Sequence, residues 1–151
     1  TDCLLKRGAL RVYALDVGHN QLAWSLREDV RVVVMEKVNI RRAPPDLLPE
    51  PVDFMCCDVS FISLELVIPA ALRYARVGTQ AIFLVKPQFE VGKTRVGKGG
   101  IVRDEMARME ALSKIHEIAS DNGFVELASL ESPLPGTKGN IEFLLKGTFS
   151  G

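Results

Sequence analysis

Short apolar runs alternate with helical patterns along this chain, and each run predicts a buried strand. The runs occupy residues 11–17, 32–36, 52–58, 81–85, 124–130 and 140–145. Residues 1–7, 21–27, 64–75 and 105–122 have the apolar spacing of helices, with Gly8 and Gly123 as stops after the first and the last. Alternating strands and helices predict an α/β fold with a doubly wound, mostly parallel sheet. We expect the last two strands to pair as an antiparallel hairpin at its edge.

The totals describe an ordinary globular domain. The chain has 151 residues, and its 19 basic and 19 acidic residues cancel. Nucleic-acid binding must therefore come from a local patch or from a further domain. Cys3, Cys56 and Cys57 lack metal-ligand spacing, which indicates reduced thiols and a cytoplasmic location. No apolar run approaches the roughly 20 residues of a membrane span. Because the chain opens on Thr1 rather than on methionine, we expect a piece of a longer protein.

Lys86 stands at the carboxyl end of the predicted strand 81–85, and Pro87 ends that strand. Open α/β sheets bind their ligands at the carboxyl ends of parallel strands. A lysine in this place either transfers a proton or holds a charge. The alternative is a strand-end lysine whose stem packs on the core while its ammonium reaches water.

Two carboxylates are candidates to accompany this lysine. Asp58 ends the predicted strand 52–58, so it should face the crevice outside the sheet, although it could also cap the next helix. Glu142 lies among residues that are typical of a core. If it faces inward it needs a partner, for which Lys86 is the natural candidate. If it faces outward, it is simply solvated.

Asp16 ends another predicted strand and is followed by Gly18. In nucleotide-binding α/β folds, an acid at this place accepts hydrogen bonds from ribose hydroxyls. Aspartate before glycine is also ordinary turn chemistry. Asn39, just beyond the next strand, is a weaker candidate for contacting an adenine edge.

Residues 91–100 form a loop rich in glycines and cations, and a further cation follows it. Glycines allow close approach to a ligand or movement as a lid, and cations suit phosphate groups. The candidate substrate-binding residues are Lys93, Arg95, Lys98 and Arg103. The alternative is a solvated flexible loop. An NTPase P-loop is excluded, because Pro87 occupies the position of its first glycine.

Distinct motifs are spread over nearly the whole chain: DVG (16–18), QLAW (21–24), DVSFISL (58–64), KPQFEVG (86–92), VGKGGIVRD (96–104) and GNIEF (139–143). Together they resemble the TlyA family, S-adenosylmethionine-dependent ribosomal RNA 2′-O-methyltransferases that are related to FtsJ and often labelled haemolysin A. The resemblance implies a Rossmann-like methyltransferase domain that acts on ribosomal RNA or a ribosomal subunit, behind an N-terminal S4 RNA-binding domain. It implies no metal and no membrane.

The resemblance also assigns roles to residues. The family has a Lys-Asp-Lys-Glu catalytic tetrad, and its last members match Asp58, Lys86 and Glu142. The cofactor contacts that it implies are Asp16, Val17, Asn39 and Asp58.

One part of the family pattern lies outside this sequence. Family members have a glycine-rich cofactor loop, ending in Gly-Gly-Phe, just before the position of Thr1. That loop, its strand, the first catalytic lysine and the S4 domain are not in these residues. We therefore expect a partial methyltransferase domain whose sheet, without its central strand, folds poorly and binds the cofactor weakly.

For the reaction we expect a ribose 2′-hydroxyl to attack the cofactor's methyl group in line, with the protein mainly positioning the reactants. Lys86 either takes the hydroxyl proton or orients the oxygen. The trio Asp58, Lys86 and Glu142 weighs against a non-catalytic RNA-binding module with the same fold. The balanced charge and the lack of a membrane-spanning run weigh against a membrane-active haemolysin.

Overall fold

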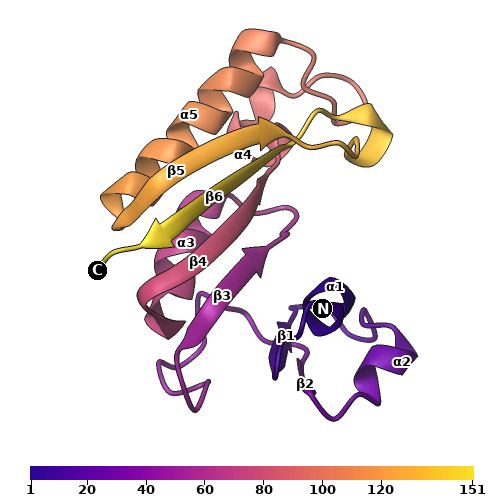
Figure 1. Cartoon of the computed structure of the whole chain (residues 1–151). Helices are drawn as coiled ribbons and strands as arrows, with labels where there is room; N and C mark the ends of the chain where they lie inside the picture. Colours follow the sequence, from indigo (N-terminus) through magenta and orange to yellow (C-terminus); the bar gives the residue numbers. More distant parts are fainter. The chain divides into compact units, whose positions relative to one another are not determined.

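The structure is a computed structural model that describes residues 1–151 and divides them into two compact units, Thr1–Leu47 and Leu48–Gly151 (Figure 1). Each unit contains its own sheet, two-stranded in the first and four-stranded in the second. The strands that were expected in a single sheet are therefore divided between two sheets, and each strand pairs only within its own unit.

The first unit is built on two short parallel strands. Its elements are α1 (Asp2–Lys6), β1 (Val12–Leu15), α2 (Trp24–Arg27) and β2 (Val32–Met35). Strand β1 pairs with β2 in parallel, and Leu5, Val12 and Val32 form the centre of a small apolar core. The expected helix 21–27 is reduced to its last turn, and the N–H groups of Asn20 and Gln21, just before it, donate to the carboxylate of Glu36.

The second unit is a mixed sheet. Its strands are β3 (Val52–Cys57), β4 (Ala75–Val85), β5 (Phe124–Glu131) and β6 (Phe143–Phe149), in the order β3-β4-β6-β5. Strands β3 and β4 are parallel, whereas β6 is antiparallel to both β4 and β5. The predicted antiparallel C-terminal strand is confirmed, and it lies inside the sheet while β5 forms the edge (Figure 1).

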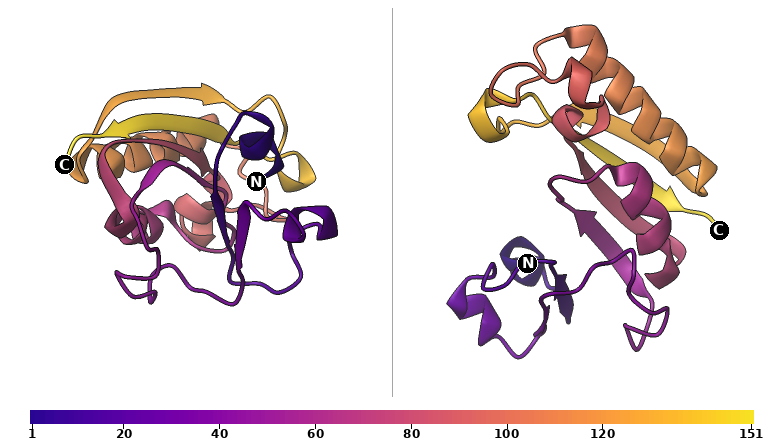
Figure 2. Two further views of the ribbon diagram at one scale, coloured as in Figure 1. Left: turned by 60° about the horizontal axis from the view of Figure 1, so that its bottom comes forward. Right: turned by 180° about the vertical axis from the view of Figure 1, so that it is seen from behind.

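Helices cover one face of this sheet (Figure 2). They are α3 (Leu64–Ala71), α4 (Pro87–Glu90) and α5 (Glu105–Asp121), with 3₁₀ turns at Leu72–Tyr74, Lys93–Arg95 and Thr137–Gly139. The core between the layers is tightly packed. Leu64, Ile68 and Ile115 of the helices and Leu145 of the sheet are almost fully buried. Burial of such side chains is the main stabilising contribution to the unit.

Two strand boundaries differ from the prediction. Strand β4 begins at Ala75 rather than at residue 81, because the buried Thr79 donates to the carbonyl of Val52 at 2.6 Å and so pairs a polar stretch with β3. Strand β6 begins at Phe143 rather than at residue 140, because the backbone of Asn140 closes a turn with Gly136 and Thr137.

Glu90 joins α4 to the beginning of α3. Ser63 caps α3 and donates to Glu90 Oε2 at 2.5 Å, while the N–H of Leu64 donates to Glu90 Oε1 at 2.9 Å. Burial raises the pKa of Glu90, although these two hydrogen bonds act in the opposite direction. The contact holds the segment between β3 and α3 close to the segment after β4.

Glu90 should make the stability of the second unit depend on pH. Its folded pKa is raised above the unfolded value of about 4.3. Its stabilising contribution is therefore fully present below that value and is lost as pH rises through the folded pKa. In thermal melts from about pH 4 to neutral pH, the parent should lose stability relative to Glu90→Gln. For Glu117→Gln, an exposed change on α5, the stability difference from the parent should be the same at every pH. Parallel curves for the parent and Glu90→Gln would contradict this account.

Candidate active site

Lys86 lies where the sequence predicted it, directly after β4. Val85 before it is fully buried, and Pro87 after it is the first residue of α4. The lysine side chain is 12% exposed. Its stem is therefore held by the fold, and its ammonium group is presented at the carboxyl edge of β3 and β4.

Asp58 directly follows β3, the parallel neighbour of β4. Because parallel strands end at the same edge, it comes beside Lys86: the lysine Nζ lies 2.6 Å from Asp58 Oδ1 and donates to Ser60 Oγ at 3.1 Å. The side chain of Asp58 is 70% exposed. Such an open ion pair adds little stability. It presents one carboxylate and one ammonium to a ligand.

Glu142 directly precedes β6 and is buried, with 6% of its surface exposed. It faces inward and has a partner, but the expectation that this partner is Lys86 is wrong. Gln88 Nε2 donates to Glu142 Oε1 at 2.8 Å, and Lys86 pairs with Asp58 instead. The physical reason is that α4 begins at Pro87, so its first turn carries Gln88 to the carboxylate. The other amide atom, Gln88 Oε1, is buried without a hydrogen-bond partner.

Gly136, in the connection between β5 and β6, packs directly against this carboxylate. A Cβ atom at position 136 would lie 2.2 Å from Glu142 Oε1. Any side chain there would displace Glu142. Gln88 on one side and Gly136 on the other therefore fix the position of the carboxylate.

The predicted phosphate-binding cations are all exposed, but they differ in their surroundings. Arg95 pairs with Glu110 and lies 3.8 Å from Asp104. The hydrogen bond from Arg95 holds the pKa of Glu110 below its ordinary value. Because α5 starts beside the loop, its acids neutralise Arg95. The side chains of the other three, Lys93, Lys98 and Arg103, form no ion pair within the chain.

In the first unit, the predicted cofactor residues are exposed at the ends of β1 and β2. Asp16 Oδ1 accepts from the N–H of Gly18 at 2.6 Å, so the turn interpretation of this residue is confirmed. Its second carboxylate oxygen remains open. Val17 is 69% exposed. Asn39 Oδ1 accepts from the N–H of Arg41 at 3.0 Å, which leaves its amide nitrogen open to a ligand.

Glu36, which directly follows β2, was not predicted. Its carboxylate accepts from the N–H groups of Asn20 and Gln21 at 3.0 and 3.1 Å and pairs with Arg27. The hydrogen bonds from the N–H groups of Asn20 and Gln21, together with the positive charge of Arg27, hold the pKa of Glu36 below its ordinary value. An acid at a strand end was the signal that could have identified it. Asp16 and Glu36 line one pocket with Thr1, Ala14, Leu15, Gln21 and Leu22.

Neither a reactive thiol nor a metal-binding group adds a further candidate to the site. Burial raises the pKa of Cys57 to about 12, so its thiol is not a nucleophile at neutral pH. No group of three His, Cys, Asp or Glu side chains could hold a metal ion. None of the helices has the length and apolar character needed to cross a membrane.

Known proteins resemble this chain along most of its length. The sequence profile of the family described as FtsJ-like methyltransferase matches residues 1–149. YqxC of Bacillus subtilis is 47% identical over 146 residues, which is 96% of this chain and 52% of that protein. The 16S/23S rRNA (cytidine-2′-O)-methyltransferase TlyA of Mycobacterium tuberculosis (strain H37Rv) is 46% identical over 145 residues, 96% of this chain and 54% of that protein. A solved structure from Streptococcus thermophilus has a TM-score of 0.93 and 44% identity, and covers 99% of this chain and 54% of that one. The chain thus spans about half the length of these relatives.

The Gln88–Glu142 contact can be tested by denaturation. Gln88→Leu should destabilise the second unit by roughly 1–3 kcal/mol, because it leaves a buried carboxylate without a donor. Adding Glu142→Met should restore most of that stability, since apolar replacement of both partners is nearly neutral. Gln80→Leu, an exposed change on β4, is the matched control. Urea denaturation measures all four proteins. If Gln88→Leu unfolds at the parent's urea midpoint, Glu142 does not depend on Gln88.

Proposed function

This chain belongs to the FtsJ-like methyltransferase family, and we propose that it transfers a methyl group from S-adenosyl-L-methionine to a ribose 2′-hydroxyl of ribosomal RNA. The observation that carries the proposal is the Lys86–Asp58 pair, presented at the carboxyl edge of two parallel strands. The name of the relative TlyA supports the choice of substrate. The partner is ribosomal RNA or a ribosomal subunit, which implies a cytoplasmic enzyme.

Lys86 orients the attacking hydroxyl. A protonated lysine has three N–H donors, and the geometry directs two of them to Asp58 and Ser60. The third donor is left for the oxygen of the substrate hydroxyl. Because the stem of Lys86 is held by the fold, this hydrogen bond places the oxygen in a defined direction, which is the main contribution a positioning site makes.

Asp58 has a second role, in moving the hydroxyl proton. S-adenosyl-L-methionine supplies, when bound, an electrophilic methyl group on a positively charged sulfur. A hydroxyl that accepted this methyl group would have to give up its proton to a nearby acceptor. The side chain of Asp58 is mostly exposed, so its carboxylate can accept that proton and pass it to water.

Glu142 supports Lys86 without contacting its ammonium group. Val85 of β4 pairs with Phe143 of β6, and Lys86 and Glu142 flank this pair of residues. The buried carboxyl group, held by Gln88, is the group through which we propose that β6 acts on Lys86.

The first unit contains residues that fit the cofactor. The open oxygen of Asp16 can accept hydrogen bonds from ribose hydroxyls, and the amide nitrogen of Asn39 can donate to an adenine ring. Val17 offers an exposed apolar surface beside them.

Lys86 provides the decisive test. In the full-length protein, Lys86→Met should leave cofactor affinity nearly intact and slow methyl transfer by roughly 10²-fold or more, because the attacking oxygen is no longer held in position. Lys86→Arg should not restore the rate, because a guanidinium has a different donor geometry. Single-turnover methylation of ribosomal RNA measures the rate, and a thermal melt checks folding. Lys146→Met, an exposed change on β6, is the control. If Lys86→Arg transfers methyl groups at the parent rate, Lys86 contributes only a positive charge at the end of the strand.

Asp16 tests the cofactor part separately. In the full-length protein, Asp16→Ala should weaken S-adenosyl-L-methionine binding by roughly 1.5–3 kcal/mol, because it removes a charged acceptor of ribose hydroxyls. Isothermal titration calorimetry gives the affinity. Asp46→Ala, an exposed acid in the same unit, should bind like the parent. Equal affinity of Asp16→Ala and Asp46→Ala would remove Asp16 from the cofactor site.

A further inference from the structure

The segment 97–103, which we call the glycine loop, is an ordered turn before α5. The N–H of Gly97 donates to the carbonyl of Ile101 and the N–H of Gly100 donates to the carbonyl of Gly97, both at 3.0 Å. Gly99 and Gly100 have φ values of +83°, a backbone conformation that residues other than glycine rarely adopt. Val102 is almost fully buried. These contacts define the conformation of the glycine loop.

Asn140 ties the glycine loop to the connection between β5 and β6. It is 3% exposed, and all its polar side-chain atoms are used. Its Oδ1 accepts from the N–H of Val102 at 3.0 Å, and its Nδ2 donates to the carbonyls of Gly100 and Thr137 at 2.9 and 3.2 Å. The buried amide of Asn140 is thus hydrogen-bonded to the glycine loop at Gly100 and Val102, and also to Thr137 in the turn that precedes it. Buried hydrogen bonds of this kind are costly to break.

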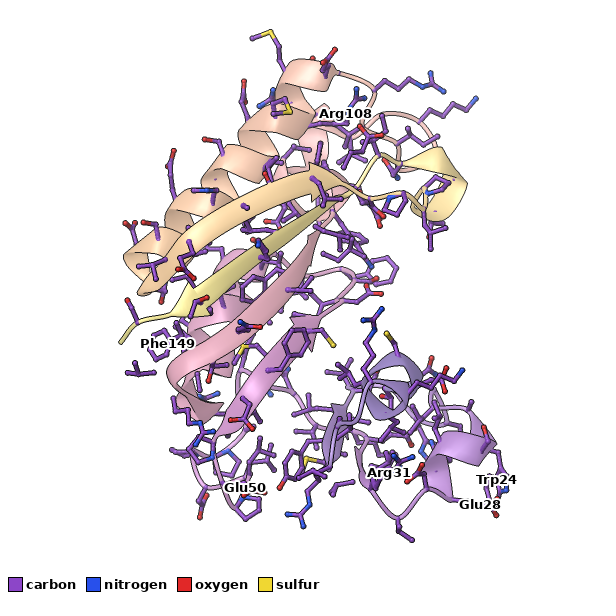
Figure 3. All side chains as sticks on the ribbon, viewed as in Figure 1. Trp24, Glu28, Arg31, Glu50, Arg108 and Phe149 are labelled. Atoms are coloured by element: carbon purple, nitrogen blue, oxygen red, sulfur yellow. The ribbon has the colours of Figure 1, made fainter.

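Two other side chains hold the same loop from different directions. Lys138 Nζ donates to the carbonyl of Gly99 at 3.0 Å. Arg108 of α5, labelled in Figure 3, donates through Nη1 to the carbonyls of Val102 and Arg103 at 3.2 and 2.9 Å. The glycine loop is therefore fastened to α5 as well as to the β5–β6 connection, which argues against a mobile lid.

We propose that Asn140 is a positioning residue that holds the glycine loop as a preformed platform, from which Lys98 and Arg103 bind phosphates of the RNA substrate. The inference rests on the proposed function. Both cations are exposed and free of ion pairs, unlike Arg95, which is paired with Glu110. A loop that is already ordered avoids the entropy cost of ordering on binding. Asn140 also stands two positions before Glu142, so one segment carries both the loop anchor and the buried carboxylate.

The residue type matters because the anchor needs a donor and an acceptor. Aspartate at position 140 would still accept from Val102 N–H but would donate nothing to Gly100 or Thr137. Alanine would do neither. These two variants therefore remove the anchor in two steps. Ser132→Ala is the matched control, because Ser132 lies in the same connection and its side chain bonds only its local turn, at Leu134.

The loop anchor is tested without RNA, by limited trypsin digestion of the folded chain. Cleavage after Lys98, followed by mass spectrometry, should be slow in the parent and in Ser132→Ala. It should be roughly tenfold faster or more in Asn140→Ala, because several hydrogen bonds to the loop disappear together. Asn140→Asp should lie between them, and it serves as the main variant if Asn140→Ala melts below the assay temperature. Equal cleavage of the Asn140 variants and Ser132→Ala would overturn the proposal.

The phosphate role is tested by RNA binding over a range of salt concentrations. Asn140→Ala should flatten the salt dependence by about 0.7 for each phosphate that the loop no longer binds, and Lys98→Met should do so for one phosphate. In methylation assays Asn140→Ala should raise KM for RNA and leave kcat nearly unchanged, a pattern that general destabilisation does not produce. An unchanged salt slope in a variant with an opened loop would overturn the phosphate role. If the parent binds no RNA, the proposed function falls too, while the trypsin rates still decide whether Asn140 orders the loop.

Discussion

Strand β4 pairs with β3 on one side and with β6 on the other, and the candidate active site of the second unit depends on this double pairing. Parallel pairing with β3 ends both strands at one edge, so Asp58 meets Lys86. Antiparallel pairing with β6 starts that strand at the same edge, so Glu142 comes there too. Phe83 and Val85 are fully buried and fix which residues of β4 face the helices. A slip of one residue would turn Lys86 to the other face of the sheet.

The short helix α4 has a second organising role, because its polar side chains reach different neighbours. Gln88 holds Glu142, and Glu90 holds the first turn of α3 through Ser63 and Leu64. Both acids are buried, and a buried acid without hydrogen-bond partners would be costly. The motif that begins at Lys86 thus supplies the ammonium group first. Its next polar residues, Gln88 and Glu90, then make the hydrogen bonds that hold the neighbouring segments. This explains why several polar residues follow a buried strand so closely.

Cations are unevenly available on the surface, although the chain carries no net charge. Arg95 is paired with Glu110 of α5 and lies near Asp104, which caps that helix. Lys98 and Arg103 form no ion pair, and hydrogen bonds from other residues hold their loop. Net charge describes the whole surface, while phosphate binding depends on a few cations in fixed positions. Asn140 carries no charge, but its hydrogen bonds hold the loop on which Lys98 and Arg103 lie.

The sequence by itself determined the elements and the placement of the main candidates. Apolar runs and the breakers after them are local signals, so β3, β4 and α5 were predicted, with Asp58 and Lys86 at strand ends. The tertiary structure alone decided the contacts between distant residues. Gln88 rather than Lys86 binds Glu142, 54 positions along the chain. Asn140 reaches Val102 and Gly100 across 38 and 40 positions. Such hydrogen bonds depend on register and loop geometry, which residue patterns within one short window do not encode.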